Sequence, residues 1–281
     1  MNILGKIKAY IEITRPINIM LTIAVVIGAA IISDTGEFDW EDVFYASLAA
    51  AFAVAAGNII NDLFDIGIDI INCPSRPLPS KRIKPIGAKI FYLILIHASF
   101  VLSGSVNVAV FIIVVIATNL LFLYSYKFKR IPLLGNFIIA SLTGLVFIYG
   151  GAAVNNMNAA VIPALFAFLI NFIREIIKDM EDLRGDEAAG IKTFPAKYGF
   201  KSSKRVVLFL SFILIFSTII PFFYELYQIE YFILVMVIVN PAIIYMIKSL
   251  YKNDSVQNLH KMSWLLKINM VIGLAAIVLG R

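Results

Sequence analysis

The sequence predicts an all-α polytopic membrane protein with nine transmembrane helices. Hydrophobic residues make up 60% of the 281 residues and charged residues only 15%, whereas soluble domains are about 45–50% apolar and about 25% charged. The apolar residues also gather in separate segments of the length that a helix needs to cross a bilayer, roughly 17–25 residues. Composition and segment length therefore agree on the fold class.

Nine apolar segments are long enough to be membrane spans. In chain order they are 16–33, 43–60, 86–104, 107–124, 133–153, 159–175, 205–223, 231–250 and 262–280. The two longest polar loops, 61–85 and 178–204, follow the second and the sixth span. Loops of this length in a compact protein are usually functional or disordered. We expect one transmembrane domain over 1–281, with these two loops as its functional part.

The basic residues predict the orientation. With nine spans, all of the 24 Lys and Arg residues except Arg281 fall on one side of the membrane. Because cytoplasmic loops of membrane proteins carry an excess of Lys and Arg, this side is predicted to be cytoplasmic, with the N-terminus on it. The same bias explains the net charge of +6, so we expect a cell-membrane protein with no nucleic-acid partner.

The first acidic motif follows the second span, at 58–69. On a helix, at about 100° per residue, its polar side chains share one face. They are Asn58, Asp62, Asp65 and Asp69. Carboxylates this close repel one another unless a cation lies between them, and Mg²⁺ prefers carboxylate oxygen.

A second acidic motif with the same spacing follows the sixth span, at 175–186. Its members are Glu175, Asp179, Asp182 and Asp186. A single motif of this kind could be a solvated helix end. Two matched copies, each at the end of a span and on the same side, favour a pair of metal sites, because ionisable groups close to a membrane are costly.

Two metal sites of this kind suit a diphosphate, since Mg²⁺ takes one or two carboxylates and completes its shell with phosphate oxygens and water. Basic residues around the motifs are candidates to contact the remaining phosphate oxygens, Arg bidentately and Lys as a point charge. They are Arg76, Lys81, Lys127, Lys129 and Lys178. If the rest of the substrate is a long apolar chain, the spans would supply a dry cavity for an allylic cation.

Asn119 and Tyr124 lie at the end of the fourth span. A tyrosine at this place is often part of the interfacial aromatic belt. The alternative is a catalytic role, in which the Tyr124 ring or the Asn119 amide stabilises an allylic cation.

Taken together, the motifs resemble those of the UbiA superfamily of intramembrane prenyltransferases. The residues that carry the resemblance are Asn61-Asp62-x-x-Asp65-x-x-x-Asp69, Arg76-Pro-Leu-Pro-Ser80, Asp179-x-x-Asp182-x-x-x-Asp186 and Gly190-Ile-Lys-Thr-Phe-Pro195. The resemblance covers nearly the whole chain. It implies nine helices around a central cavity, two Mg²⁺ ions that bridge the diphosphate of a polyprenyl donor, and a lateral opening to the bilayer.

The resemblance implies a role for each motif residue. One ion would be held mainly by Asp62 and Asp65 with support from Asn58, and the other mainly by Asp179 and Asp182. Asp69 and Asp186 would hold waters, neighbouring cations or the outer shell of the metals. Lys129 and Lys178 would neutralise diphosphate oxygens.

One family feature is altered. The family commonly has Tyr-x-x-x-Lys after the fourth span, whereas this chain has Tyr124-Ser-Tyr-Lys127-Phe-Lys129-Arg130, with no Lys four residues after either Tyr. The role of that pair would fall to Tyr124 with Lys129 or to Tyr126 with Arg130.

Within the superfamily, the short chain and the stretch 76–83 are most similar to archaeal enzymes that use a lipid phosphate as acceptor. This similarity implies attack of the free hydroxyl of geranylgeranylglyceryl phosphate on geranylgeranyl diphosphate. The acceptor's phosphate would then require further cations, for which the candidates are Arg15, Lys81, Arg82 and Lys84.

Two other functions stay open. An aromatic acceptor, such as 4-hydroxybenzoate or another quinone precursor, would use the same donor chemistry. A transporter for a divalent cation or an anionic solute belongs to a different class. Transporter sites usually lie near the bilayer midplane at broken helices, whereas both acidic motifs lie at span ends, which favours the enzyme.

Overall fold

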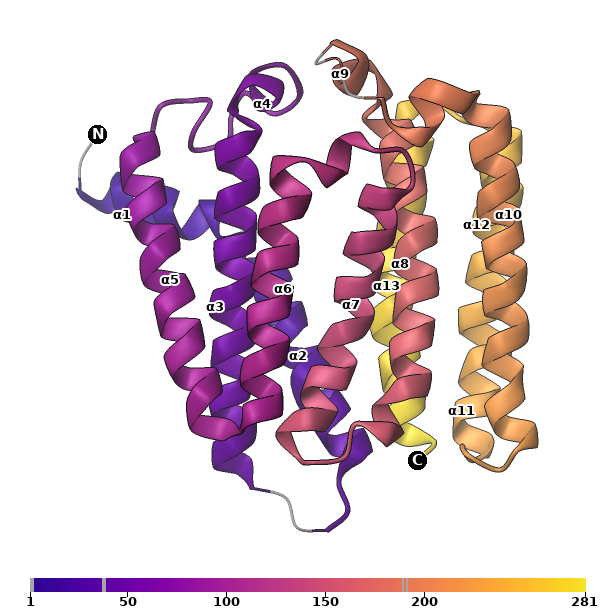
Figure 1. The fold of residues 1–281 in the computed structure, drawn as a ribbon. Helices are drawn as coiled ribbons and strands as arrows, with labels where there is room; N and C mark the ends of the chain where they lie inside the picture. The colour runs from indigo at the N-terminus through magenta and orange to yellow at the C-terminus, as the bar shows by residue number, and fades with distance from the viewer. Residues whose placement is uncertain (1–2, 37–38, 189, 191) are drawn as a thin grey trace. The chain divides into compact units, whose positions relative to one another are not determined.

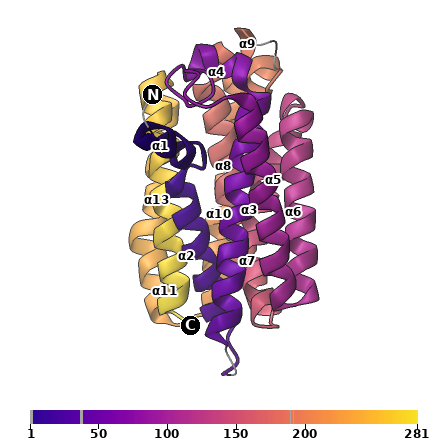
Figure 2. The same ribbon diagram turned by 90° about the vertical axis from the view of Figure 1, so that its left-hand side faces the viewer.

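The computed structural model describes residues 3–36, 39–188, 190 and 192–281. Every regular element in these ranges is a helix (Figures 1 and 2). Nine helical segments within them are long and apolar enough to cross a membrane. They are Pro16–Ser33, Trp40–Phe64, Pro85–Val106, Val108–Tyr126, Leu134–Ala153, Asn158–Glu181, Phe194–Phe223, Ile229–Lys252 and Val256–Leu279. The predicted fold class and number of spans are therefore confirmed.

The chain divides into two compact units. The first unit contains residues 1–129 and 145–160, and the second contains residues 130–144 and 161–281. Helix α7 (Leu134–Ala153) belongs to both, because its N-terminal half lies in the second unit and its C-terminal half in the first. Each unit carries one of the two Asp motifs. The predictions of a single domain and of one central cavity stay predictions.

Helix α3 (Trp40–Phe64) is the centre of the first unit, where it packs against α2 (Pro16–Ser33), α5 (Pro85–Val106) and α6 (Val108–Tyr126). Its apolar window is 67% buried, compared with 22% in α5 and in α6. The reason is an alanine-rich middle, since small residues let helices approach closely in a membrane. Asp39 caps the helix by accepting a 2.8 Å hydrogen bond from the Glu41 amide. This rigid helix carries the first Asp motif at its C-terminal end.

Gly150 on α7 is a test of this close packing. A Cβ at this position would lie 2.6 Å from the Ala29 Cβ and 2.7 Å from the Val26 carbonyl oxygen, both on α2. Neither atom belongs to a flexible side chain, so we expect Gly150→Ala to destabilise the protein by about 1–3 kcal/mol, as overpacking does. Gly273→Ala in α13 (Val256–Leu279) is the matched control, because nothing lies within 4 Å of its Cβ. Thermal unfolding in detergent should show a lower Tm for Gly150→Ala only, and equal Tm values would contradict the packing.

In the second unit, α8 (Val161–Glu181) packs against α10 (Phe194–Phe223) and α13. Between α11 (Ile229–Leu234) and α12 (Asn240–Lys252) the helix forms a π-helical turn, Val235–Val239. The Asn269 side chain of α13 donates a 3.1 Å hydrogen bond to the Val239 carbonyl in that turn. A π-helical turn leaves backbone groups without a regular α-helical hydrogen-bond partner. Here a side chain of a neighbouring helix bonds to one of these groups.

The structure extends several elements beyond the predicted apolar segments. Helix α10 begins at Phe194 rather than at 205, with a break at Gly199, whose φ is +76°. Helix α13 begins at Val256 rather than at 262, because Ser255 caps it. Polar first turns lie outside an apolar window, so counting apolar residues misses them. The prediction also missed α1 (Ile3–Ile13), whose exposed Leu4, Ile7 and Ile11 share one face, as in helices that lie in a membrane interface.

Candidate active site

The first Asp motif joins two helices. Helix α3 ends at Phe64, Asp65 is its C-cap with φ −97° and ψ 5°, and α4 (Ile66–Asn72) begins directly after it. The prediction of one continuous helical face over 58–69 is therefore wrong. Asp and Gly favour caps and turns over helix interiors, and Asp65 is followed closely by Gly67. The carboxylates are nevertheless all buried, with 2%, 9% and 4% of Asp62, Asp65 and Asp69 exposed.

Each carboxylate of this motif has a basic partner. Asp62 forms an ion pair with Arg15, and Asp65 forms one with Lys129. Arg76 Nη1 lies 2.7 Å from both carboxylate oxygens of Asp69 and 3.7 Å from Asp62 Oδ1. Because a buried charge is costly unless it is paired, these three cations allow the carboxylates to be buried. The structure thus brings together four of the residues predicted for the site, Arg15, Asp62, Asp69 and Arg76, and pairs two others, Asp65 and Lys129.

The local backbone explains how two of the cations reach the motif. Arg15 stands between α1 and α2 with φ +54°, and Pro16 begins α2 directly after it. Asn58 fixes this junction to α3, since its side-chain nitrogen donates a 2.9 Å hydrogen bond to the Thr14 carbonyl. The amide oxygen of Asn58 is then the group suited to ligate a metal.

Arg76 stays charged in this setting. Burial alone would lower the pKa of its guanidinium, but the hydrogen bond to Asp69 and the charges of Asp62 and Asp69 outweigh burial, so that its pKa is raised. A permanently cationic, planar Arg beside two carboxylates is well suited to contact phosphate bidentately.

The other basic residues predicted in the first unit are placed differently. Arg82 donates hydrogen bonds of 2.6 and 2.7 Å to the two carboxylate oxygens of Glu12 on α1. Lys81 is exposed with φ +59°, and Lys127 is exposed at the C-cap of α6. The prediction missed Glu12, since nothing in the sequence connects it with a residue 70 positions later.

The pair of Glu12 and Arg82 predicts a pH effect on stability. The Arg82 hydrogen bond lowers the pKa of Glu12 below its usual 4.5, so the stabilisation is present above pH 4.5 and is lost as the pH falls through the lower pKa of the folded state. We expect Arg82→Gln to lower Tm by at most a few degrees at pH 7, since partly exposed pairs contribute about 0–1 kcal/mol. In a pH series of thermal unfolding, this difference should become smaller as the pH falls below 4.5, and a difference that stays constant would contradict the role of this pair.

The residues predicted to stabilise an allylic cation lie on α6. The Asn119 side chain is exposed and donates a 2.7 Å hydrogen bond to the Val115 carbonyl of its own helix. Tyr124 is partly buried one turn further on. Of the two, Tyr124 is therefore the better candidate to face a bound substrate.

The second Asp motif has the same backbone plan as the first. Helix α8 ends at Glu181, the chain bends at Asp182, and α9 (Leu183–Ala188) follows. The Asp182 amide donates to the Lys178 carbonyl at 2.9 Å, and the Asp186 amide donates to the Asp182 carbonyl at 3.1 Å. The first motif has the equivalent bonds at Asp65 and Asp69, of 3.0 and 2.8 Å. The two motifs thus share their spacing and their helix break.

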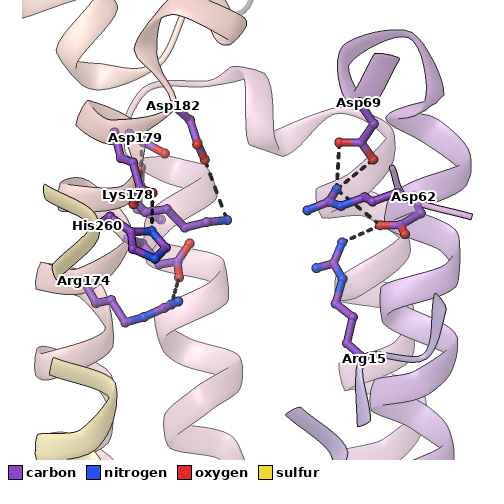
Figure 3. Close-up of polar contacts among 12 residues, drawn as sticks. Arg15, Asp62, Asp69, Arg174, Lys178, Asp179, Asp182 and His260 are labelled. Atoms are coloured by element: carbon purple, nitrogen blue, oxygen red, sulfur yellow. Dashed lines mark hydrogen bonds and ion pairs between the residues drawn. The ribbon is translucent and has the colours of Figure 1, made fainter. Parts of the chain in front are cut away.

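The side chains of the second motif also have polar and basic partners, and Arg174 Nη1 lies 2.6 Å from Glu175 Oε1. Asn136 on α7 donates a 2.8 Å hydrogen bond to Asp179 Oδ2. Lys178 Nζ lies 3.9 Å from Asp182 Oδ2, with both side chains about 40% exposed (Figure 3). The prediction missed Asn136, although a polar amide near the start of an apolar span is a signal that could have found it.

The donor set of the motifs fits Mg²⁺. All side-chain donors in them are oxygens, which a hard cation prefers. Within the described ranges, no group of three or more His, Cys, Asp or Glu residues is gathered tightly enough to form a metal centre on its own. Mg²⁺ does not require such a cage, since it usually takes one or two carboxylates together with waters and substrate phosphates.

The fold and these motifs define a class, that of helical membrane enzymes that act on phosphorylated substrates. Comparison with known proteins identifies the family within that class. The chain belongs to the UbiA prenyltransferase family, whose model matches residues 21–271.

Similar proteins cover almost the full length of the chain. A digeranylgeranylglyceryl phosphate synthase of Methanocaldococcus jannaschii is 40% identical over 279 residues, which is 98% of this chain and 96% of that protein. A solved structure of a digeranylgeranylglyceryl phosphate synthase is 38% identical, with a TM-score of 0.78 and 98% of each chain covered. A UbiA homologue from Archaeoglobus fulgidus bound to DMAPP and Mg²⁺ shares the fold, with 19% identity, a TM-score of 0.67, and 95% of this chain and 98% of that chain covered.

Proposed function

We propose that the protein transfers a geranylgeranyl group from geranylgeranyl diphosphate to the free hydroxyl of geranylgeranylglyceryl phosphate. The product contains the second ether bond of archaeal membrane lipid. The full-length similarity to digeranylgeranylglyceryl phosphate synthases supports the choice of acceptor. The observation that carries the diphosphate chemistry is the group of three buried carboxylates with Arg15, Arg76 and Lys129 in the first unit.

Mg²⁺ is the proposed cofactor, as two ions, and it would polarise the diphosphate and make it a better leaving group. Asp62 and Asp65 with Asn58 are the proposed ligands in the first unit, and Asp179 and Asp182 in the second. Asp69 and Asp186 take supporting places, which in the first unit agrees with the two bonds from Arg76 to Asp69. The Mg²⁺ and DMAPP in the Archaeoglobus homologue support this type of donor.

The cations of the motifs are proposed to bind the diphosphate oxygens. Arg15, Arg76 and Lys129 lie beside the carboxylates that would hold the metal. Lys127 and Lys178 are more exposed and are proposed as further contacts. Charge that develops on the departing diphosphate is then met by fixed positive groups, which is the largest single term in many enzymes.

In the reaction, the allylic C–O bond to the diphosphate breaks and an ether C–O bond to the acceptor forms. The allylic cation is proposed to face the Tyr124 ring, with Asn119 as the alternative. The acceptor's hydroxyl proton passes to the departing diphosphate. We place this site on the cytoplasmic side, because the basic residues that share its side of the spans follow the positive-inside rule.

The test is incubation of purified protein with labelled geranylgeranyl diphosphate, Mg²⁺ and a panel of acceptors, followed by identification of the product. We expect label in digeranylgeranylglyceryl phosphate and release of one diphosphate per transfer. If only 4-hydroxybenzoate is labelled, the acceptor is an aromatic acid rather than the lipid phosphate, and the proposed donor chemistry still holds. If the protein releases no diphosphate with any acceptor, the proposal that it is a prenyltransferase is contradicted, and the transporter alternative stays open.

A further inference from the structure

A pocket in the second unit lies beside the second Asp motif, from which it takes Lys178 and Glu181. It is lined by Arg174, Lys178 and Glu181 of α8 and by His260, Trp264 and Lys267 of α13. Its volume is about 150 Å³, below the roughly 300–1,000 Å³ of pockets that enclose a whole drug-sized ligand. The pocket can therefore take a small headgroup but not a prenyl chain.

The lining is strongly cationic. It has three basic side chains, Arg174, Lys178 and Lys267, against one lining carboxylate, Glu181, whose Oε1 lies 2.7 Å from His260 Nδ1. Arg174 also pairs with Glu175, which is not part of the lining, at 2.6 Å. Lys267 Nζ stands 5.4 Å from the centre of the Trp264 ring. Since these bases belong to helices that are candidate membrane spans, placing them together is costly, and such residues are usually paired or mark a substrate path. The pocket is thus suited to an anion.

Asp179 of the second Asp motif lies on a different face of α8 from this pocket. At about 100° per residue, Arg174, Lys178 and Glu181 share one face, which α13 covers. The Asp179 side chain is about 100° further round and bonds to Asn136 on α7. Asp179 is therefore not part of the lining, and a metal bound to it would leave the pocket open to an anion.

Two of the cations predicted for the acceptor's phosphate are held by carboxylates of the first unit. Arg15 is paired with Asp62 and Arg82 with Glu12, whereas Lys81 and Lys84 are exposed. The proposed reaction has two phosphorylated substrates, and the Asp motifs account for only the donor's diphosphate. The acceptor's phosphate monoester still requires a site.

We propose that the pocket between α8 and α13 binds the phosphate monoester of the acceptor lipid. Arg174 and Lys267 supply the charge, His260 supplies a further nitrogen, and Trp264 covers the apolar side of the glycerol. The identity of this ligand rests on the proposed function above. Lys267 is the residue that decides the test, because it has no place in the diphosphate site.

The first experiment compares two acceptors at saturating donor, geranylgeranylglyceryl phosphate and its dephosphorylated form. Lys267→Met should raise KM for the phosphorylated acceptor about tenfold or more, the usual effect of losing a hydrogen bond to a charged group. It should leave KM for the dephosphorylated acceptor and for the donor within about twofold. Lys267→Arg should restore most of the loss. Lys261→Met, an exposed position on the same helix, is the matched control and should behave as wild type.

The second experiment measures binding of glycerol phosphate to the purified protein by calorimetry, without donor. Wild type and Lys261→Met should bind alike, and Lys267→Met should bind about tenfold or more weakly. If Lys267→Met leaves both the binding of glycerol phosphate and the acceptor KM unchanged, the pocket is not the phosphate site, even if transfer is normal. Equally strong competition by phosphatidylglycerol in nanodiscs would also overturn it, since the site would then bind bulk lipid. If the wild-type protein transfers no geranylgeranyl group, the proposed function is contradicted. The binding experiment still tests whether the pocket is a phosphate site.

Discussion

Asp62→Asn and Asp179→Asn should each lower the rate of geranylgeranyl transfer by about 10²–10³-fold, the usual cost of losing one fixed group that stabilises developing charge. Asn keeps the shape of the side chain and removes the negative charge that makes a carboxylate a strong Mg²⁺ ligand. The two positions are equivalent in the repeated motif, so the account expects similar losses at both. The rates should be measured with purified protein at saturating Mg²⁺ and both substrates.

The control for this pair is Asp254→Asn, whose carboxylate is half exposed and pairs with Lys204 on α10. It should keep wild-type turnover. Each variant's Tm should be recorded, because Asp62→Asn also leaves Arg15 beside a neutral partner. A folded Asp62→Asn or Asp179→Asn protein with near-wild-type turnover would contradict the role of that motif.

Lys129→Met should lower both stability and turnover. Its side chain is 9% exposed and that of its partner Asp65 is 13% exposed, and removing one partner of a buried pair costs about 3–5 kcal/mol. Lys129 is also proposed to contact the diphosphate directly, so we expect transfer to fall about 10²-fold. Thermal unfolding and steady-state kinetics measure the two effects separately.

The double variant Lys129→Met with Asp65→Asn separates structure from catalysis. Removing both charges should recover most of the stability, because no uncompensated charge stays buried. It should not recover activity, since the diphosphate contact and a proposed metal ligand are both missing. Lys204→Met is the control, because its partner Asp254 is half exposed. Recovery of turnover together with stability would show that Lys129 serves only the fold.

The sequence could predict the membrane spans because long apolar segments are a strong signal that needs no tertiary information. It could also identify the two motifs, since equal spacing is visible directly. The helix breaks at Asp65 and Asp182 were not predictable from spacing alone. A regular angle per residue assumes an unbroken helix, and the cap that ends it depends on local hydrogen bonds.

The partners of the site residues were the least predictable part. Arg15 with Asp62 and Asn136 with Asp179 join residues more than 40 positions apart, so they depend on how the helices pack. Arg82 was expected to contact substrate, but the structure pairs it with Glu12 because α1, a helix outside the apolar segments, lies beside its loop. The pocket of α8 and α13 arises in the same way, from Arg174 and Lys267 on two separate spans.

The central claim is that both Asp motifs bind one donor diphosphate through Mg²⁺. Its most direct test is the Kd of an unreactive geranylgeranyl diphosphate analogue, with Mg²⁺ or with EDTA, for wild type, Asp62→Asn, Asp179→Asn and the double variant. The account predicts that each single variant loses most of the Mg²⁺-dependent affinity and that the double variant loses little more, since groups that act as a unit are not additive. Losses that multiply in the double variant, or one single variant that binds as wild type does, would contradict it.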